Sequence, residues 1–549
     1  MTGSGPTAPT APPGPAGPAG VEPAGPATAA GPAKPAGPTA PAGPAGAGPT
    51  AAGAPAGVEP AGPVLDAVRS WRREHAAEVL AGFAGLLALD NVTGDVPALR
   101  RNAAEIVARL RARGAEAEAV GPDGVAPLVI GRVPARSGAP RLGLYAHYDG
   151  QPVTPADWGT PPFEPTLVAP DGTTVRFPPP GAPVDDEWRL HARAAADDKA
   201  PVAALLAALD ALDALDAAAA EREVELVLCF EGEEESGSTH LGELLAEHAD
   251  RLAADAWLIC DGPVQPGNAP QVVLGVRGFT DLELTVYGPV RELHSGHYGN
   301  WAPNPALELA RLLASMKDAA GRVTIDGFTA DTRPPTATER AVLDGMPPVE
   351  DGLLDRLGLA AAEVPGSRLL DRLMLPSLNV RGLRAADVGP AARNVIPACA
   401  TASIDIRLAA GDDPARMLDR VRRHVVRQGY LVVQDREPTA AERRAHRAVA
   451  RIDARVGYPA ARAPLDLPVV GHLRELAARA ADAEAIALPT LGGSVPLHHF
   501  GEVLDTPAVI LPIANPDNNQ HAADENLRLG NLWYGVDLFA LLLTTPWQP

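Results

Sequence analysis

The sequence predicts an α/β protein in which a smaller α+β domain interrupts a larger domain. Three observations support this fold class. Short apolar runs typical of buried strands alternate with helical patterns. From residue 276 onward the order of strands and helices becomes β-α-β-β-α-β, which is the ferredoxin-like arrangement. After residue 435 the first kind of alternation resumes and continues to residue 549.

The first 63 residues consist almost entirely of proline, alanine, glycine and threonine. Their PAGPAG units lack the strict glycine-every-third period of collagen. Because the stretch has few side chains to bury, it cannot offset its chain entropy. We therefore expect a disordered, partly polyproline-like N-terminal tail without a catalytic role. A tail that binds a partner is the alternative.

Residues 64–275 form the first part of the larger domain. They begin with the helical spacing of VLDAVRSWRREHAAEVLAGFAGLLAL. The runs LGLYA, VELVLCF and AWLIC are continuously apolar, as strands are when both faces of a sheet are buried. The helical pattern APVAALLAALDALDALDAAAAER separates the first two runs. We expect a sheet with flanking helices.

Residues 276–435 form the interrupting domain, and residues 436–549 return to the larger one. The strand VRGFTDLELTVYG precedes the helix NPALELARLLASMKD. The strands SLNVRGL and ATASIDIRLA, the helix DPARMLDRVRRHVVRQG and the strand YLVVQ complete the order. An insertion at about 318–373, rich in proline, aspartate and leucine, lies inside this domain.

The composition excludes several classes of partner. The chain has 549 residues, 47 basic against 68 acidic side chains and a net charge of −21. This balance argues against nucleic acid and anionic lipid, which both need a basic face. No apolar run is long enough for a membrane span, and no secretory signal is visible. Three widely spaced cysteines do not form a disulfide framework, so we expect a reducing, cytoplasmic compartment.

Imidazoles and carboxylates follow four apolar runs. Ligands of open α/β sheets lie just beyond the carboxyl ends of the strands, so these residues are expected to meet at one edge. A fifth segment, ADDK at 196–199, opens the alanine-rich helix. The segments that follow the four runs are HYD at 147–149, EGEEESGS at 231–238, DG at 261–262 and NPDNNQH at 515–521.

A buried group of carboxylates is costly unless a cation neutralises it. A mixed set of histidines and carboxylates suits zinc, or alternatively manganese or cobalt. Each segment alone is compatible with a surface ion pair or a solvated loop. The placement of all of them after successive strands is what indicates a metal site.

Five motifs occur in order: AHYDGQP, RAAADDK, EGEEESGS, ICDG and a late histidine. In this the chain resembles the clan MH metallopeptidases, over roughly residues 64–549. These include carnosinase-type dipeptidases, carboxypeptidase G, aminoacylase and succinyl-diaminopimelate desuccinylase. The resemblance implies a dinuclear zinc hydrolase whose mixed-sheet catalytic domain is interrupted by a lid or dimerisation domain. It also implies a homodimer.

The resemblance assigns roles to individual residues. It implies that one zinc is held by His147 and Asp261, the other by Glu235 and His521, with Asp197 bridging the two. It further implies that Glu234 is the general base, that Asp149 orients His147 and that the Asp197–Asp198 peptide bond is cis. Two metals share a water and lower its pKa. Glu234 would then take the proton and pass it to the leaving amine.

A lid histidine stabilises the oxyanion in this family, often from the partner subunit, and His294 in RELHSGHYGN matches it. Arg407 and Asn394 match the residues that hold the substrate carboxylate. Gly492, Gly493 and Ser494 resemble the loop that grips the carboxyl end of the substrate. An ordinary tight turn is the alternative for this glycine pair.

The chain departs from the family pattern near the bridging carboxylate. Alanine stands at 192, 194 and 200, where the family usually has glycine. Alanine disfavours positive φ. Either the backbone near Asp197 therefore differs from that of the family, or the family's glycines do not need a positive φ.

The segments HYDGQP and DWGTPPFEP are most similar to the dipeptidase and carboxypeptidase branch, which act on small peptides. The alternatives are an N-acyl-amino-acid deacylase, of acetyl or succinyl type, and an inactive metal-binding member.

Overall fold

The computed structural model describes residues 62–215, 221–265, 267–493 and 495–549. Most of the predicted N-terminal tail, residues 1–61, and the candidate site residue Ser494 lie outside the described residues. In the parts that are described, none of the helices combines the length and the apolar character needed to cross a membrane.

An eight-stranded mixed sheet forms the centre of the larger domain, with the order β1-β2-β7-β3-β8-β20-β9-β19. The neighbours β7, β3, β8 and β20 are parallel, so the four apolar runs of the sequence lie side by side. The predicted α/β class is confirmed. The strands are β1 (Glu116–Val120), β2 (Leu128–Val133), β3 (Arg141–His147), β7 (Glu225–Glu231), β8 (Ala256–Ile259), β9 (Gln271–Val273), β19 (Ile486–Leu488) and β20 (Ala508–Ile510).

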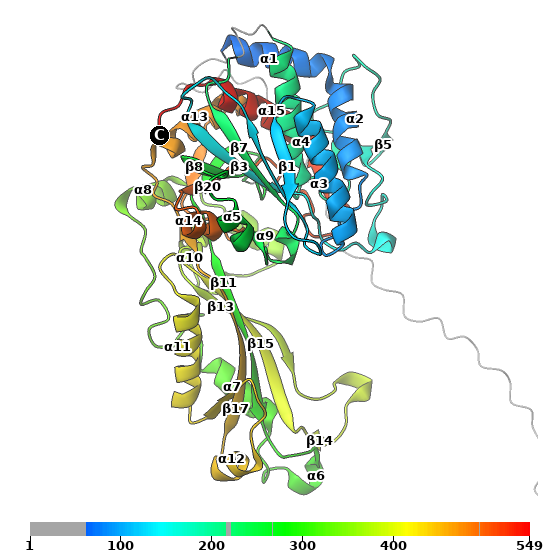
Figure 1. The fold of residues 1–549 in the computed structure, drawn as a ribbon. Coiled ribbons are helices and arrows are strands. Elements are labelled where there is room, and N and C mark those ends of the chain that lie inside the picture. The colour runs from blue at the N-terminus through cyan, green and yellow to red at the C-terminus, as the bar shows by residue number, and fades with distance from the viewer. Residues whose placement is uncertain (1–61, 216–220, 266, 494) are drawn as a thin grey trace, which may run out of the picture. The chain divides into compact units, whose positions relative to one another are not determined.

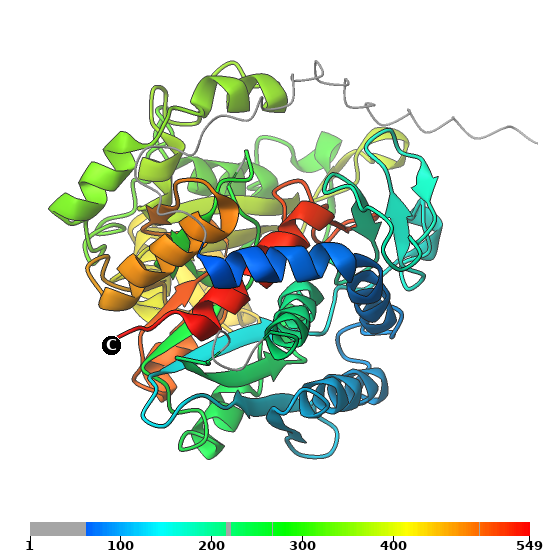
Figure 2. The same cartoon turned by 90° about the horizontal axis from the view of Figure 1, so that it is seen from above.

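Successive residues of the central strands face opposite sides of the sheet, and both sides are buried. On β7, Leu228 and Phe230 belong to one core, while Val227 and Cys229 belong to the other. Helices therefore cover both faces (Figure 1), and Figure 2 shows α1 in blue beside α15 in red. The first face carries α1 (Pro63–Glu74), α2 (Ala76–Leu87), α3 (Val96–Arg111), α4 (Lys199–Asp213), α13 (Pro468–Ala481) and α15 (Leu529–Thr544), and the second carries α5 (Leu241–Glu247) and α14 (Leu497–Val503).

A small four-stranded sheet positions the loop that carries Asp197. Its order is β21-β6-β4-β5, and His191 pairs with Asn526 at the point where the chain leaves β6. This pairing places residues 192–198 beside the segment that ends at Glu525. The strands are β4 (Thr166–Val168), β5 (Thr174–Val175), β6 (Arg189–His191) and β21 (Asn526–Arg528), and a 3-10 turn η1 (Pro155–Asp157) precedes them.

The domain that the resemblance describes as a lid, called the lid below, contains a five-stranded sheet with the order β13-β15-β11-β17-β16, covered on one face by α7 and α11 (Figure 1). On α11, Met417, Val421 and Val425 recur at helical spacing and pack against the sheet. The elements are β11 (Gly278–Tyr287), β13 (Ser377–Arg384), β15 (Cys399–Leu408), β16 (Leu431–Gln434), β17 (Val449–Tyr458), α7 (Pro305–Ala314) and α11 (Pro414–Arg427).

One feature of the lid corrects the domain boundary expected from the sequence. β11 pairs with β15 on one side and with β17 on the other, and β16 lies beyond β17 as a parallel edge strand. The ten residues of β17 match the ten of β11, whereas β16 has only four. The lid sheet therefore extends past residue 435, where the sequence places the end of this domain.

The remaining elements connect the two sheets or belong to the lid insertion. They are β10 (Gly275–Val276), β12 (Leu293–His294), α6 (Ser295–Tyr298), α8 (Ala337–Gly345), α9 (Glu350–Leu357), α10 (Leu369–Leu373), η3 (Gly389–Ala391), β14 (Val395–Ile396), α12 (Ala440–Ala445) and β18 (Ala461–Arg462).

Candidate metal centre

The ends of the parallel strands bring histidine and carboxylate side chains together. His147 ends β3, and Asp261 follows β8. Two groups of possible ligand atoms result, each within 4.8 Å: His147, Asp197 and Asp261 form one, and Asp197, Glu235 and His521 form the other. Asp197 belongs to both groups.

The distances show how the two groups are linked. Nε2 of His147 lies 2.9 Å from Oδ1 of Asp197 and 4.0 Å from Oδ2 of Asp261. Nε2 of His521 lies 3.0 Å from the other Asp197 oxygen, Oδ2, and 3.2 Å from Oε2 of Glu235. Each oxygen of the Asp197 carboxylate therefore faces a different imidazole, which is the arrangement that a bridging ligand needs.

Asp149 ties together the two strand ends that carry the candidate base and ligands. Its Oδ1 lies 3.4 Å from Nδ1 of His147. The same carboxylate accepts hydrogen bonds from the backbone N–H of Glu234, at 3.2 Å, and of Glu235, at 3.1 Å. Glu234 and Glu235 begin the 3-10 turn η2 (Glu234–Ser236). One buried side chain thus contacts the imidazole of His147 and accepts two hydrogen bonds from the turn beside it.

The charges of the cluster indicate that it binds cations. Burial, together with the neighbouring carboxylates of Asp197 and Glu235, raises the pKa of Asp261 to about 7. Burial lowers the pKa of His147, but the hydrogen bonds to Asp149 and Asp197 outweigh it and raise this pKa well above its usual value. Divalent cations would remove the repulsion among these carboxylates. The donor set of imidazole and carboxylate fits zinc, manganese or cobalt.

The environment of Glu234 suits proton transfer. Burial raises the pKa of Glu234 well above its usual value, and the carboxylates of Asp261 and Asp197 add to this effect. A carboxylate whose pKa is raised is a stronger base than one that is fully exposed.

Glu525, which the sequence interpretation missed, holds the loop that carries Asp197. Its carboxylate accepts hydrogen bonds from the backbone N–H groups of Ala194, Ala196 and Asp197 at 2.9–3.1 Å. It also accepts one at 2.7 Å from Nη1 of Arg193. Glu525 is 0% exposed, so the whole arrangement is buried. No spacing rule connects position 525 with position 197.

The loop around Asp197 resolves the question that the missing glycines raise. Ala194 has φ of 63°, so this position requires the left-handed conformation and alanine adopts it. Ala192 and Ala200 have no positive φ. The Asp197–Asp198 peptide bond is cis, as the resemblance implies.

The other candidate residues lie on the lid and on the loop after β19. His294 pairs with Val395 in the β12–β14 ribbon, and the backbone N–H of Ser295 donates to the carbonyl of Asn394 at 2.9 Å. His294 and Asn394 are thus neighbours, and both are exposed. Arg407 lies on β15, over the ring of Phe279.

The glycine loop follows Leu491, which contacts the catalytic domain near β10. The backbone N–H of Leu491 donates to the carbonyl of Gly275 at 2.9 Å, which holds the loop against β10. Cδ1 of Leu491 lies 4.0 Å from the position that a Cβ on Gly262 would occupy. Gly262 directly follows Asp261. Gly492 and Gly493 therefore follow Leu491, whose side chain lies near Gly262, the residue after the candidate ligand Asp261.

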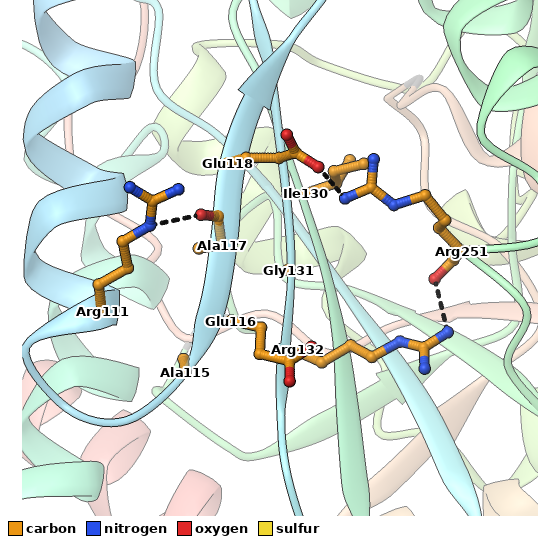
Figure 3. Close-up of a pocket in the computed structure, with 9 residues that line it drawn as sticks. All are labelled: Arg111, Ala115, Glu116, Ala117, Glu118, Ile130, Gly131, Arg132 and Arg251. Atoms are coloured by element: carbon orange, nitrogen blue, oxygen red, sulfur yellow. Dashed lines mark hydrogen bonds and ion pairs between the residues drawn. The ribbon is translucent and has the colours of Figure 1, made fainter.

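A separate surface pocket of about 600 Å³ lies at the outer edge of the large sheet (Figure 3). Arg111, Arg132 and Arg251 surround it, and Arg111 donates to the carbonyl of Ala117 at 2.8 Å. No candidate ligand lines this pocket, so it is distinct from the metal centre.

Comparisons with known proteins support the same interpretation. A family model described as "Peptidase family M20/M25/M40" matches residues 143–545. The Cys-Gly metallodipeptidase dug1 of Schizosaccharomyces pombe is 26% identical over 422 residues, covering 75% of this chain and 81% of that protein. The Beta-Ala-His dipeptidase of Homo sapiens is 25% identical over 458 residues, covering 80% and 82%.

Among solved structures, the M20 family metallo-carboxypeptidase Sso-CP2 from Sulfolobus solfataricus has a similar fold. The TM-score is 0.69 at 24% identity, and the match covers 85% of this chain and 98% of that chain. The two chains share the fold over nearly the whole of the described region.

Proposed function

The chain belongs to peptidase family M20/M25/M40, and from this premise we propose that it is a metal-dependent dipeptidase with two zinc ions. The observation that carries the proposal is the pair of ligand groups that share Asp197. His147 and Asp261 would complete one zinc site, and Glu235 and His521 the other. Manganese or cobalt would fit the same donors.

When bound, the two ions supply Lewis acidity that polarises a peptide carbonyl and acidifies a water molecule. Glu234 accepts the proton of the attacking water and delivers it to the nitrogen of the leaving amine. Asp149 holds the Glu234 backbone in place during this transfer through the hydrogen bond described above. His294 would donate a hydrogen bond to the oxygen that becomes negatively charged.

The ring of His294 has the right tautomer for this role. The backbone N–H of Gly296 donates to its Nδ1 at 3.1 Å, so in the neutral ring the proton lies on Nε2. Nε2 is then a donor that can reach a substrate.

A homodimer would bring His294 to the site of the partner subunit. The edge strand β13 supports this proposal, because its last six residues, 379–384, are all exposed. Val380, Leu383 and the nearby Val388 are 40%, 64% and 85% exposed. An open strand edge with apolar side chains favours pairing with a second copy.

The substrate carboxylate would be held by Arg407 and Asn394 of the lid and by the backbone of Gly492 and Gly493. A guanidinium offers two parallel donors to a carboxylate. The free cysteines Cys229, Cys260 and Cys399 support a reducing, cytoplasmic setting.

The test is hydrolysis by the zinc-loaded protein. The relatives' names mention Cys-Gly and Beta-Ala-His, so these dipeptides are assayed beside N-acetyl and N-succinyl amino acids. Cleavage of dipeptides, with a loss of about 10²–10⁴-fold in kcat for Glu234→Gln at unchanged zinc content, supports the proposal. Cleavage of only the acyl substrates would instead identify a deacylase. If wild type and Glu234→Gln are equally slow on every substrate, the chain is an inactive metal-binding protein.

The dimer is tested by mixing inactive His294→Ala with inactive Glu234→Ala chains. In a mixed dimer, one site has both an intact Glu234 and an intact His294 from the partner. Recovered activity is expected, and its absence in proven heterodimers would contradict action across the interface.

A further inference from the structure

Gln151, to which the sequence interpretation assigns no role, donates a hydrogen bond to a candidate metal ligand. Its Nε2 lies 2.7 Å from Oε2 of Glu235. The Glu235 side chain is only 2% exposed, so water competes little for this contact. Gln151 lies in the loop that follows β3, whereas Glu235 lies in the turn that follows β7. The pairing of these two parallel strands therefore brings the donor and the acceptor together.

The oxygen that accepts from Gln151 also faces the second candidate metal site. Nε2 of His521 lies 3.2 Å from Oε2 of Glu235. Each oxygen of an ionised carboxylate has about two lone pairs. One lone pair of Oε2 can accept from Gln151, and the other remains for a cation that His521 also binds. The hydrogen bond from Gln151 is therefore compatible with the role of Glu235 as a ligand.

Asp149 and Gln151 together hold both ends of Glu235. Asp149 accepts a hydrogen bond from the backbone N–H of Glu235 at 3.1 Å, and Gln151 donates to its carboxylate. A ligating imidazole needs an acceptor at its other nitrogen, whereas a ligating carboxylate needs a donor. Asp149 offers the acceptor to His147, with 3.4 Å between Oδ1 and Nδ1. Gln151 offers the donor to Glu235.

The segment that carries Gln151 is packed between two buried side chains. Nδ2 of Asn91 donates to the carbonyl of Tyr148 at 2.9 Å, and the backbone N–H of Gly150 donates to the carbonyl of Asn91 at 2.9 Å. A Cβ on Gly150 would lie 3.1 Å from Nδ2 of Asn91 and 3.1 Å from Cδ of Arg193, which is tighter than most Cβ contacts. Asn91 and Arg193 are 0% and 2% exposed. The backbone before Gln151 therefore has little freedom to move.

We propose that Gln151 is a positioning residue for the metal site formed by Glu235 and His521. It acts through the carboxylate of Glu235 and is not itself a ligand. The affinity of one zinc ion then depends on the Gln151 amide, whereas that of the ion held by His147 and Asp261 does not. This inference rests on the proposed two-metal function.

The experiment is zinc titration of the metal-free full chain against a chelating indicator that competes for each bound ion. Gln151→Met keeps the length of the side chain and removes the N–H donor. For this variant we expect an affinity about 10–100-fold lower for one of the two zinc ions and an unchanged affinity for the other. Gln434→Met is the matched control, because Gln434 is exposed at the end of β16. It should bind zinc as the wild type does.

A second pair of variants separates positioning from a general effect on the fold. Glu235→Ala removes the ligand through which Gln151 is proposed to act. In that background, Gln151→Met should leave the affinity of the remaining zinc ion unchanged, because the two substitutions then affect the same interaction.

The outcomes separate the positioning role from the proposed reaction. Wild-type affinities for both zinc ions in Gln151→Met would overturn the role of Gln151. A further loss of affinity in the Glu235→Ala background would also overturn it, because Gln151 would then act elsewhere than on Glu235. The expected zinc affinities without cleavage of any dipeptide would leave the role of Gln151 intact and overturn the dipeptidase. A wild type that binds fewer than two zinc ions would overturn the two-metal centre and the role of Gln151 with it.

Discussion

Replacing Glu525 with alanine should destabilise the protein by at least about 3 kcal/mol. The carboxylate accepts from four buried donors, the guanidinium of Arg193 and the backbone N–H groups of Ala194, Ala196 and Asp197. Arg193 is 2% exposed and Glu525 is 0% exposed, so water does not replace the lost partner without rearrangement.

The magnitude follows from what the substitution leaves behind. Removing one partner of a buried ion pair costs about 3–5 kcal/mol, because the other charge stays buried. Each unsatisfied backbone N–H adds about 1–3 kcal/mol before the loop relaxes. We take the lower limit of the ion-pair cost as the minimum. Glu525→Gln keeps an acceptor oxygen and loses the charge, so a smaller loss of about 1.5–3 kcal/mol is expected.

The assay is urea denaturation of the metal-free protein, because bound metal adds its own stabilisation. Glu187→Ala is the matched control. It removes a glutamate from an ion pair with Arg528, but the Glu187 side chain is 56% exposed, so a loss below about 1 kcal/mol is expected. Zinc titration of each folded variant then measures whether Asp197 has been displaced.

A stability of Glu525→Ala within about 1 kcal/mol of wild type, on the order of the control, would refute the predicted cost of the unpaired Arg193. That result would mean that the loop finds other partners for its donors.

Three further predictions follow from the same region. Asp149→Asn should reduce zinc affinity or kcat by about 10–100-fold, because a hydrogen-bonded partner behind a ligand is lost; unchanged values in a zinc titration and in kcat would contradict the orienting role. Burial raises the pKa of Glu231 to about 8. The hydrogen bond from Tyr145 opposes this shift, and the charge of Asp149 adds to it. The folded state therefore holds this proton more tightly than the unfolded state, so stability falls as pH rises from about 4.3, the ordinary glutamate pKa, toward this raised value, by up to roughly 1.4 kcal/mol per pH unit. In urea titrations of the metal-free proteins, Glu231→Gln should not show this decrease in the free energy of unfolding with pH. Parallel pH profiles of wild type and variant would disprove the role of Glu231. Ala194→Gly should stabilise by up to about 1 kcal/mol because the left-handed strain outweighs the added chain entropy, whereas Ala195→Gly should destabilise; a lower melting temperature for Ala194→Gly would count against this.

The central sheet could be predicted because each of its strands has a recognisable sequence pattern. Buried parallel strands are continuously apolar, so LGLYA, VELVLCF and AWLIC were recognisable without any knowledge of their partners. The strand order of the lid sheet is harder to predict, because the pattern of a strand does not reveal which neighbour it pairs with. The segment 431–434 has a strong strand pattern, yet the position beside β11 is taken by 449–458, which mixes charged and apolar residues.

The candidate ligands were accessible from the sequence for a related reason. His147 is the last residue of β3, and Asp261 lies two residues beyond the end of β8. The order and direction of these strands fix where their ends lie, so a rule about strand ends is enough to group the two residues. No such rule points to Glu525. Glu525 reaches Asp197 only because β21 pairs with β6, a contact between segments more than 300 residues apart.

The burial of the leucines in the insertion is also not predictable from the sequence pattern. In the sequence, Leu353, Leu354 and Leu357 have the spacing of a helix that packs into a core, and a core would have buried them. The structure instead leaves Leu357 60% exposed, in the lining of a surface pocket. A helical apolar pattern therefore predicts a face that packs into a core, but only the fold shows how far the protein buries that face.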